Sequence, residues 1–390
     1  MKRPGDHRDP EEDSTGKCSR TRVPDPLEGI PYPEFPPDVY EYVKNMRDEG
    51  PECEEMMRLC RRKHDPVRWI KAFTAAGNGT VDADMIMIRL LRALIWRQTE
   101  SVIEGCTHNC RCGAHTCRCG AHQSDHTTVD VVHRTYVRST RRSWIEVYRE
   151  KLRASEWGKS HAPIPSNTNI TNSIQVLNKD MLETARNAVK DFGGRVAIVN
   201  MASRYKAGGN YRGGAGAQEE NLHRRTDLHR WTTRFPQDYP IPEGWALVYE
   251  NVTILRGEEK DGYPFLTDAC RVTVISASAV KQPELFCLEP GKTPCEYLDI
   301  VQKATMQKEI AVIIAAAAHH KCNRLVLSAF GCGAFQNPPE AVAEMIRQEL
   351  QNHPFQQVMI CIVDDHNAKR EHNPRGNFEP FAEVFHPVIA

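Results

Sequence analysis

A glycine-rich segment followed directly by a polar triple offers the clearest chemistry in the sequence. It reads AGGNYRGGAGAQEE, with Gln218, Glu219 and Glu220 behind the glycines. Glycines let the backbone approach a ligand closely and adopt positive φ, and a carboxylate beside such a loop can act as a general acid or base. Glycine content alone is also typical of a mobile surface turn, and acidic residues are favoured in the solvated first turn of a helix.

A second glycine-rich turn follows later in the chain, in LSAFGCGAFQNPPEAVA. The pattern predicts an apolar strand, a turn at 331–333 and a helix opened by two prolines. Backbone amides of such a turn can hold a diphosphate without lysine or metal, and the GK[ST] ending of a Walker loop is absent. Cys332 is better explained as a small apolar filler than as a nucleophile, because no His flanks it in this loop. Phe335 fits either the core or a flat surface against a sugar or base.

Alternating strand and helix patterns predict the elements that position these loops. Apolar or alternating runs predict strands at 172–177, 195–200, 246–255, 271–276, 324–330 and 357–363. Helical periodicity predicts helices at 178–191, 301–319 and 338–350. Helices that alternate with apolar strands predict an α/β layer fold with a mixed sheet, in which ligand sites gather at the carboxyl ends of the strands.

The first third of the sequence has a different character. Residues 1–36 are rich in Pro and charge and are expected to form a disordered leader, whereas 37–105 is expected to be a helical region. Residues 106–134 contain the repeat CRCGAH twice, which predicts either an inert linker or a metal knuckle. The possible ligands of a structural Zn are Cys110, Cys112, His115, Cys117, Cys119 and His122.

Composition excludes several classes of protein. The 390 residues include 51 Lys plus Arg against 51 Asp plus Glu, so direct, sequence-specific nucleic-acid binding is not expected. The longest apolar run, 310–318, is short of the roughly 20 residues that cross a membrane, and no signal-peptide pattern opens the sequence. We therefore expect an intracellular protein, cytoplasmic or nuclear, whose cysteines are reduced thiols or metal ligands rather than disulfides.

Together, the two loops resemble the microbial-type poly(ADP-ribose) glycohydrolases. The first resembles that family's signature of three glycines, a spacer and Gln-Glu-Glu, and the second resembles its diphosphate loop, in the same order. The similarity runs from about residue 135 to 386 and implies a macrodomain-like three-layer fold over 135–390, with a central mixed sheet flanked by helices. It also implies an enzyme that cleaves the ribose glycosidic bond of poly(ADP-ribose) or protein-linked ADP-ribose, with no cofactor or metal in the chemistry.

The resemblance implies residue roles as well. Glu220 corresponds to the catalytic carboxylate, and Glu219 corresponds to a neighbouring residue that binds and orients the ribose. Gln218 corresponds to another residue in the same wall of the binding site. Adjacent residues project in different directions, so one carboxylate acts while the other positions. Further substrate contacts are expected from Gly208, Gly209, Asn210, Gly213, Gly214, Gly331, Cys332, Gly333, Ala334 and Phe335, with Asn200 and Ser203 as candidates for adenine and ribose contacts or for simple loop hydrogen bonds.

The sequence departs from the family at two positions, and this keeps other functions open. Ala207 stands where the family usually has Pro, and Asn210 replaces the third glycine. Asn is the non-glycine residue that best tolerates left-handed geometry, so the turn is expected to persist with the Asn210 side chain near the distal ribose. One alternative is a non-catalytic ADP-ribose reader, and another is a metal-dependent partner-binding protein built on the Cys/His repeat. The complete Gln-Glu-Glu triple favours the hydrolase over the reader.

Overall fold

The computed structural model describes residues 64–76, 81–108, 137–138, 174–234, 236–287, 295–351, 353–365 and 368–386. The predicted leader and the six possible zinc ligands of the Cys/His repeat lie outside these ranges. Among the described helices, none is both long enough and apolar enough to cross a membrane.

Seven strands form the central sheet, which is mixed, as predicted. Their order across the sheet is β1-β4-β5-β3-β8-β9-β2. The five strands from β5 to β2 run parallel to their neighbours, and β1 and β4 are antiparallel at one edge. In chain order the strands are β1 (Val137–Arg138), β2 (Ile174–Leu177), β3 (Val196–Met201), β4 (Trp245–Arg256), β5 (Phe265–Ala277), β8 (Arg324–Leu327) and β9 (Gln357–Cys361).

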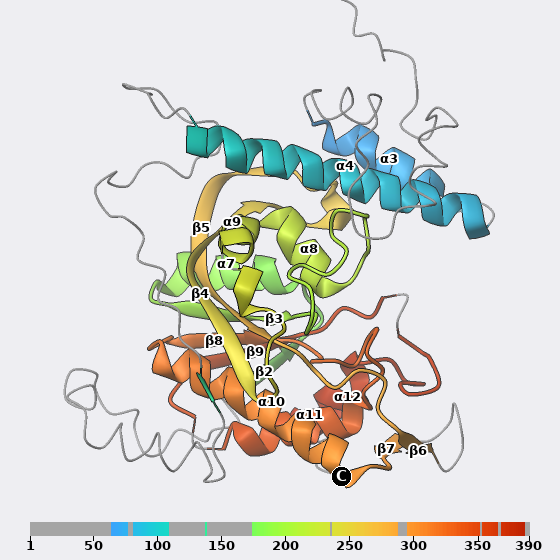
Figure 1. Cartoon of the computed structure of the whole chain (residues 1–390), viewed down its shortest axis with the longest axis vertical. Helices are drawn as coiled ribbons and strands as arrows, with labels where there is room; N and C mark the ends of the chain where they lie inside the picture. The colour runs from blue at the N-terminus through green and yellow to red at the C-terminus, as the bar shows by residue number, and fades with distance from the viewer. Residues whose placement is uncertain are drawn as a thin grey trace, which may run out of the picture.

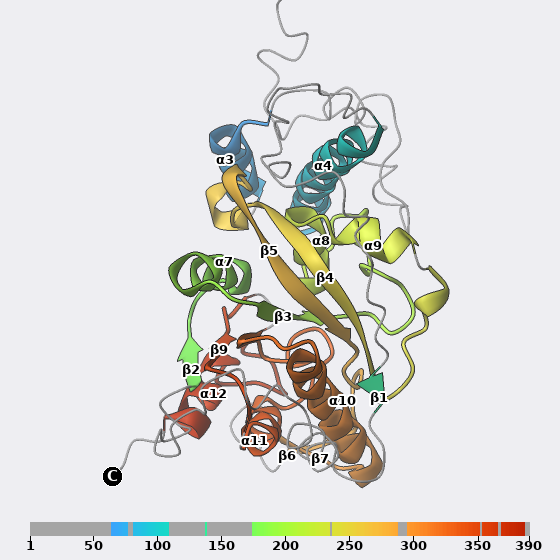
Figure 2. The same cartoon turned by 90° about the vertical axis from the view of Figure 1, so that its left-hand side faces the viewer.

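Helices cover both faces of this sheet and give the three layers (Figures 1 and 2). One face carries α7 (Met181–Phe192), α8 (Gln218–Arg225) and α9 (Leu228–Arg234), and the other carries α10 (Ile300–His319), α11 (Pro339–Glu349) and α12 (Phe378–Phe385). Two short 3-10 turns, η2 (Pro236–Asp238) and η3 (Glu259–Asp261), flank β4. The predicted α/β class and macrodomain-like layering are confirmed.

Local sequence explains why these elements form where they do. The run at 196–199 in β3 is buried throughout, because the central strands of a parallel sheet are covered on both faces. At the start of α7, the Asp180 side chain accepts a hydrogen bond from the Glu183 amide at 2.8 Å, and Gly193 ends the helix with a φ of 62°. The predicted helix between these two signals is confirmed.

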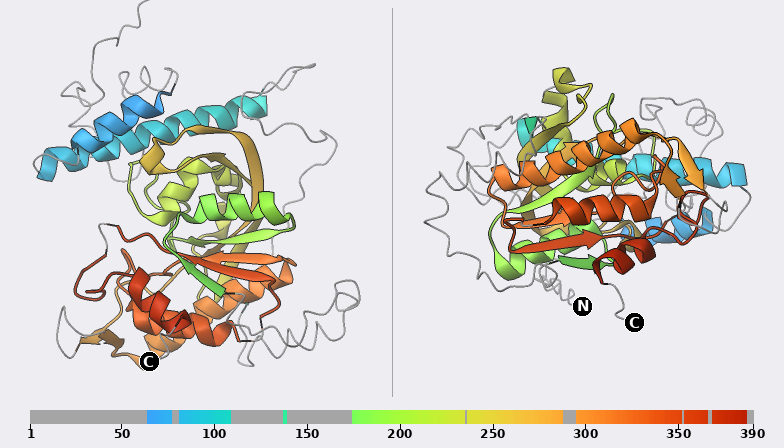
Figure 3. Two further views of the ribbon diagram at one scale, coloured as in Figure 1. Left: turned by 180° about the vertical axis from the view of Figure 1, so that it is seen from behind. Right: turned by 90° about the horizontal axis from the view of Figure 1, so that it is seen from below.

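Two further helices, α3 (Pro66–Ala76) and α4 (Val81–His108), pack outside α8 (Figure 1). Their apolar faces form a separate small core in which Trp69 stacks on Phe73 and meets Tyr263 edge-on. The view from behind in Figure 3 shows α4 lying across the top of the sheet domain. The helix runs to His108 and therefore extends past residue 105, where the helical region was predicted to end.

A two-stranded ribbon, β6 (Leu285–Cys287) and β7 (Cys295–Tyr297), lies beside α10 and α11. Its register places Cys287 opposite Cys295, and the two form a disulfide. The expectation of reduced cysteines is wrong for this pair, because the ribbon brings together two thiols whose pairing their sequence context did not reveal. The free cysteines in the described part of the chain are Cys270, Cys322, Cys332 and Cys361.

Candidate functional site

The first glycine loop joins β3 to α8 and folds tightly over the carboxylates that follow it. Gly208 and Gly209 have φ values of 77° and 58°, a region that side chains rarely occupy. A Cβ at Gly209 would lie 2.4 Å from Glu220 Oε1, and one at Gly208 would lie 2.4 Å from the Tyr211 ring. Any larger residue at these two positions would therefore displace the carboxylate or the loop.

Asn210 does not adopt the left-handed geometry expected of it. Positive φ in this turn is confined to Gly208 and Gly209, so the turn needs no third glycine for its backbone. The Asn210 amide donates to Glu220 Oε1 at 3.0 Å, and its side-chain oxygen accepts from the Gly213 amide at 3.2 Å. Asn210 therefore closes the loop and lines neither of the two cavities described below.

Glu219 fastens the start of the glycine loop to α8. One carboxyl oxygen accepts from the Ser203 amide at 2.7 Å and the other from the Gly208 amide at 2.9 Å. Burial of this group raises its pKa to about 8, the nearby charge of Glu220 adds to the rise, and the two amides oppose it. Both oxygens are thus engaged in holding the loop.

Glu220 has a different environment although it is the next residue. It is only 8% exposed, and one oxygen, Oε1, is bound by the Asn210 amide. The other, Oε2, has no hydrogen-bond partner within the described structure. Because buried polar atoms are usually paired, a buried carboxyl oxygen without a partner beside a cavity is suited to contact a ligand.

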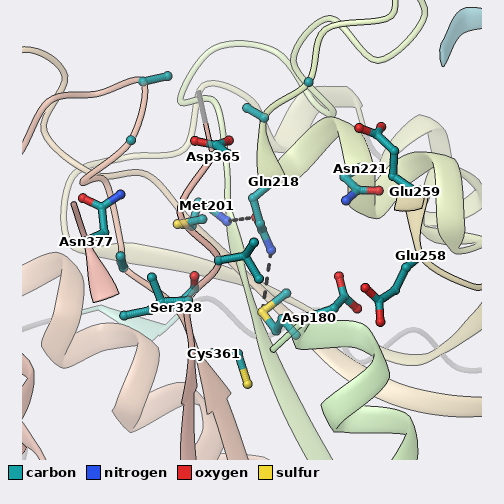
Figure 4. A pocket seen from close by; sticks show the side chains of 18 of the residues that line it. Asp180, Met201, Gln218, Asn221, Glu258, Glu259, Ser328, Cys361, Asp365 and Asn377 are labelled. Carbon is teal, nitrogen blue, oxygen red and sulfur yellow. Dashed lines mark hydrogen bonds between the residues drawn. The ribbon is translucent and has the colours of Figure 1, made fainter. Parts of the chain in front are cut away.

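Gln218 ties the beginning of α8 to the end of β3. Its Oε1 accepts from the Met201 amide at 2.9 Å, and its Nε2 donates to the Val199 carbonyl at 2.9 Å. Figure 4 shows the Gln218 side chain reaching across the cavity wall between Met201 and the start of α7. These bonds fix α8 at the carboxyl end of β3, where the fold class predicts ligand sites.

Helix α4 braces the outer side of the same loop. Arg89 Nε donates to the Gly213 carbonyl at 2.9 Å, and a Cβ at Gly214 would lie 1.9 Å from the Arg89 carbonyl oxygen. Trp96 packs edge-on against Tyr211, with ring centroids 4.4 Å apart. Gly213 and Gly214 were predicted as substrate contacts, but the structure places them against α4 and in neither cavity.

The second glycine loop follows β8 and faces the first loop. Gly331 has a φ of 75°, and Asn337 holds the loop through a 3.0 Å bond to the Gly331 carbonyl and a 2.8 Å bond from Tyr297. Cys332 is fully buried with its thiol directed to the Phe330 carbonyl, and burial raises its pKa. That environment supports Cys332 as an apolar filler rather than a nucleophile. Gly331, Gly333, Ala334 and Phe335 line a cavity beside this loop.

Two cavities open between the loops, and we call them the first and second cavity. The first, of about 550 Å³, is lined by Asp180, Gly216, Gln218 and the Gly331–Phe335 turn, among others. The second, of about 690 Å³, is lined by Ser203, Gly209, Glu219 and Glu220, among others. They share a wall made by Met201, Ala217, Ala279, Ala334 and Phe335. The two loops therefore meet at one cleft, with Glu220 just beyond the shared wall.

Sequence reasoning missed much of the first cavity. Asp180 caps α7 at the carboxyl end of β2, a position at which the fold rule predicts ligand contacts, so the signal was present. Burial alone would raise the pKa of Asp180, but Arg225, bound to it at 2.7 and 2.9 Å, lowers it overall. Lys179, Arg92 and Asp365 also line this cavity. Contacts from α4 and from the segment after β9 were invisible because they depend on packing between distant parts of the chain.

Asn200 lies inside the sheet rather than in the cleft. It is fully buried, lines neither cavity, and its Nδ2 donates to Ser276 Oγ at 2.9 Å. Ser203 lines the second cavity, and its backbone amide serves Glu219. Of these two candidates, only Ser203 faces the cleft.

No cluster of metal-binding side chains occurs among the residues that the structure describes. The six possible zinc ligands between Cys110 and His122 lie outside them, so the zinc hypothesis gains no support here.

Comparison with known proteins agrees with the resemblance found in the motifs. Residues 125–254 match the model of the family described as microbial-type PARG, catalytic domain. The resemblance to that family is confirmed. The match includes the first glycine loop and the Gln-Glu-Glu triple. Among curated protein sequences, no significant match is found.

Solved structures share the fold of the sheet domain. Poly(ADP-ribose) glycohydrolase from Thermomonospora curvata, bound to the inhibitor ADP-HPD, is 22% identical, with a TM-score of 0.52 over 75% of this chain and 98% of that chain. A second structure of the Thermomonospora enzyme is 23% identical, with the same TM-score and coverage. The enzyme from Deinococcus radiodurans in complex with ADP-ribose is 24% identical, with a TM-score of 0.45 over 55% of this chain and 84% of that chain.

Proposed function

We propose that this protein is a hydrolase that binds ADP-ribose in the cleft between the two glycine loops and cleaves the glycosidic bond of its distal ribose. One observation carries the proposal: Glu220, which lines the second cavity beside the shared wall, has a buried carboxyl oxygen without a partner in the described structure. The family match over residues 125–254 supports the same reaction class.

The reaction needs two proton transfers at one carboxyl group, the first from Glu220 and the second back to it from water. Protonated Glu220 donates its proton to the glycosidic oxygen as the bond from that oxygen to the anomeric carbon breaks, and the sugar passes through an oxocarbenium-like state. A water then adds its oxygen to the anomeric carbon and gives a proton to the Glu220 carboxylate. The products are free ADP-ribose and the released alcohol or acid, with Glu220 protonated again.

The surroundings of Glu220 suit this role. The Asn210 amide fixes Oε1, so the unpaired Oε2 is the atom directed at substrate. Glu219 is engaged by two amides and acts as the positioning residue that keeps Gly208 and Gly209 over the active carboxyl. The diphosphate would rest on backbone amides of the Gly331–Phe335 turn, which needs no metal ion.

The natural substrates that fit are poly(ADP-ribose) and ADP-ribose attached to modified proteins. The Thermomonospora enzyme named above is bound to the inhibitor ADP-HPD, and this supports the ligand class. No cofactor is required by the reaction as written, since acid, base and water complete it.

Substitution of Glu220 tests the proposal directly. Glu220→Gln should lower ADP-ribose release from labelled polymer by about 10²- to 10⁴-fold, because the amide cannot transfer the proton. Calorimetry should show nearly unchanged ADP-ribose binding. Glu284→Gln, an exposed substitution that lines neither cavity, is the matched control and should turn over like wild type.

Two results would contradict the proposal in different ways. Unchanged turnover by Glu220→Gln would remove Glu220 from its role. Tight ADP-ribose binding by the wild type, with no product from any ADP-ribosylated substrate, would assign the protein to the non-catalytic readers.

A further inference from the structure

Asn337 holds the turn on which the diphosphate is proposed to rest. It is fully buried, and its Nδ2 donates to the Gly331 carbonyl at 3.0 Å and to the Val280 carbonyl at 2.7 Å. Gly331 lines the first cavity, and a Cβ there would lie 2.7 Å from Asn337 Nδ2. The side-chain amide thus fixes Gly331 against the segment that follows β5.

Tyr297 of β7 sets the orientation of this amide. Its hydroxyl donates to Asn337 Oδ1 at 2.8 Å, and both residues are buried. An amide side chain can exchange the places of its oxygen and nitrogen by rotation, but a donor on the oxygen keeps the nitrogen directed at the two carbonyls. Tyr297 lines neither cavity. It is therefore a positioning residue that acts on the ligand turn through Asn337.

The place of Tyr297 depends in turn on the short ribbon of β6 and β7. Leu285 pairs with Tyr297, and Cys287 pairs with Cys295. None of the three residues of β6 is fully buried, and a two-stranded ribbon is only marginally stable in water. The disulfide links the two strands beside the Tyr297 pair. It therefore excludes the open conformations in which the strands separate.

The two cysteines of this bond differ in exposure. Cys295 is fully buried, with its Sγ 3.6 Å from the Glu371 carbonyl oxygen, whereas Cys287 is half-buried. An incoming thiolate therefore approaches the bond from the side of Cys287. Disulfides that thiols can reach are the labile and regulatory ones, in contrast to those sealed in a core.

We propose that the Cys287–Cys295 disulfide is a redox control of the diphosphate turn. Its reduction releases β7, separates Tyr297 from Asn337 and weakens ADP-ribose binding. This inference rests on the proposed function, because the Gly331–Phe335 turn is the proposed diphosphate site.

A dithiol is the reductant, and the exchange takes two steps. One thiolate of the dithiol attacks Cys287 Sγ, the S–S bond breaks, and Cys295 leaves as a thiolate that takes up a proton. The second thiol of the dithiol loses its proton and attacks the mixed disulfide. The reductant closes its own disulfide, and Cys287 leaves as a thiolate and is protonated. Two electrons pass from the dithiol to the protein.

ADP-ribose binding before and after reduction tests the proposal. We expect calorimetry to show an affinity about fivefold lower after treatment with dithiothreitol, because a hydrogen bond that positions the turn is lost. Tyr297→Phe keeps the ring and removes the hydroxyl. It should lower the affinity of the oxidised protein to a similar extent, and reduction of this variant should then add little.

Two cysteine variants separate this bond from the other thiols. Cys287→Ser breaks the disulfide and keeps the buried Cys295, so it should bind ADP-ribose like the reduced wild type and give no response to dithiothreitol. Cys270→Ser is the matched control. Cys270 is a free thiol of β5 that lines neither cavity, so this variant should bind and respond as the wild type does.

Hydrogen exchange of the peptide segment 330–337 gives a readout that needs no ligand. Dithiothreitol should accelerate exchange of this segment in the wild type and leave it unchanged in Cys287→Ser. A protein that does not bind ADP-ribose would contradict the proposed function, whereas the exchange rates would still show whether the disulfide controls the turn. The two failures are therefore distinguishable.

Three outcomes would overturn the inference. Equal ADP-ribose affinity in the oxidised and reduced protein, or equal exchange of 330–337 where no ligand binds, would show that the disulfide does not control the turn. A response to dithiothreitol that persists in Cys287→Ser would assign the effect to other cysteines. A response that Tyr297→Phe leaves undiminished would show that the effect bypasses Asn337.

Discussion

Glu219 and Glu220 show how two neighbouring carboxyl groups acquire different tasks. The peptide between them directs one side chain to the amides of Ser203 and Gly208, and the other into the second cavity. The division of roles could be anticipated from their adjacency, because successive side chains project in different directions. Which Glu220 oxygen lacks a partner could not be anticipated, because that depends on the direction in which the Asn210 amide points.

The raised pKa of Glu219 predicts a specific pH dependence of stability. The folded state keeps a proton up to about pH 8, whereas the unfolded chain loses it near 4.5. The contribution of protonated Glu219 to the free energy of unfolding is therefore fully present below pH 4.5. It is lost as the pH rises toward 8, and the free energy of unfolding then falls by up to about 1.4 kcal/mol per pH unit.

Glu219→Gln should remove this dependence, because an amide does not titrate. Urea unfolding of both proteins between pH 4.5 and 8.5 should show the wild type losing stability relative to the variant as the pH rises. Parallel curves for the two proteins would contradict the raised pKa.

At the scale of elements, α4 acts as a brace for the glycine loop. The loop lies between α8, which holds it from within through Glu219, and α4, which holds it from outside through Arg89 and Trp96. A helix that packs on an active-site loop restricts its motion, and reactive geometry depends on that restriction.

Arg89→Ala tests this bracing role. Loss of one hydrogen bond should lower the free energy of unfolding by about 1 kcal/mol, which denaturant titration can measure. Turnover should fall severalfold while ADP-ribose affinity stays close to wild type, because Gly213 and Gly214 lie outside both cavities. Lys71→Ala, at an exposed position on α3, should change neither quantity. Normal turnover in the Arg89 variant would show that α4 only adds stability.

Most of the strands and helices of the sheet domain could be predicted from the sequence, because their signals are local. The apolar run at 196–199, the cap at Asp180 and the stop at Gly193 each lie within a few residues of the element they define. Ribbon β6–β7 and its disulfide could not be predicted, because Cys287 and Cys295 carry no pattern that indicates their pairing. Local patterns define elements, but pairing between them is decided by the whole fold.

At the scale of the molecule, α3 and α4 are fastened to the sheet domain by buried polar groups. Thr99 Oγ1 donates to the Arg224 carbonyl at 2.8 Å and accepts from Arg256 Nε at 2.8 Å. Arg92 forms two bonds to Glu259, at 2.8 and 2.9 Å. Helical periodicity identified the apolar face of this region but gave no information about the surface against which it packs.

Removal of residues 1–108 should therefore damage the whole molecule. The deletion uncovers α8 and Tyr263 and removes the bonds that Thr99 forms with Arg256 and that Arg92 forms with Glu259, so we expect aggregation or a strongly lowered melting temperature. Deletion of the predicted leader, 1–36, is the control and should preserve melting and ADP-ribose binding. A shortened protein that lacks 1–108 and melts like the full chain would contradict this dependence.

The edge strand β2, at 174–177, has β9, at 357–361, as its partner, and the first glycine loop faces a turn that follows β8. During synthesis the chain therefore passes through β3, β4, β5 and β8 before β2 gains its neighbour. Until the turn after β8 is in place, the acidic pair has no opposing wall, so the proposed site is completed late in folding. Pairing across so many residues is slow, so we expect closure of this edge of the sheet to be a late step in folding.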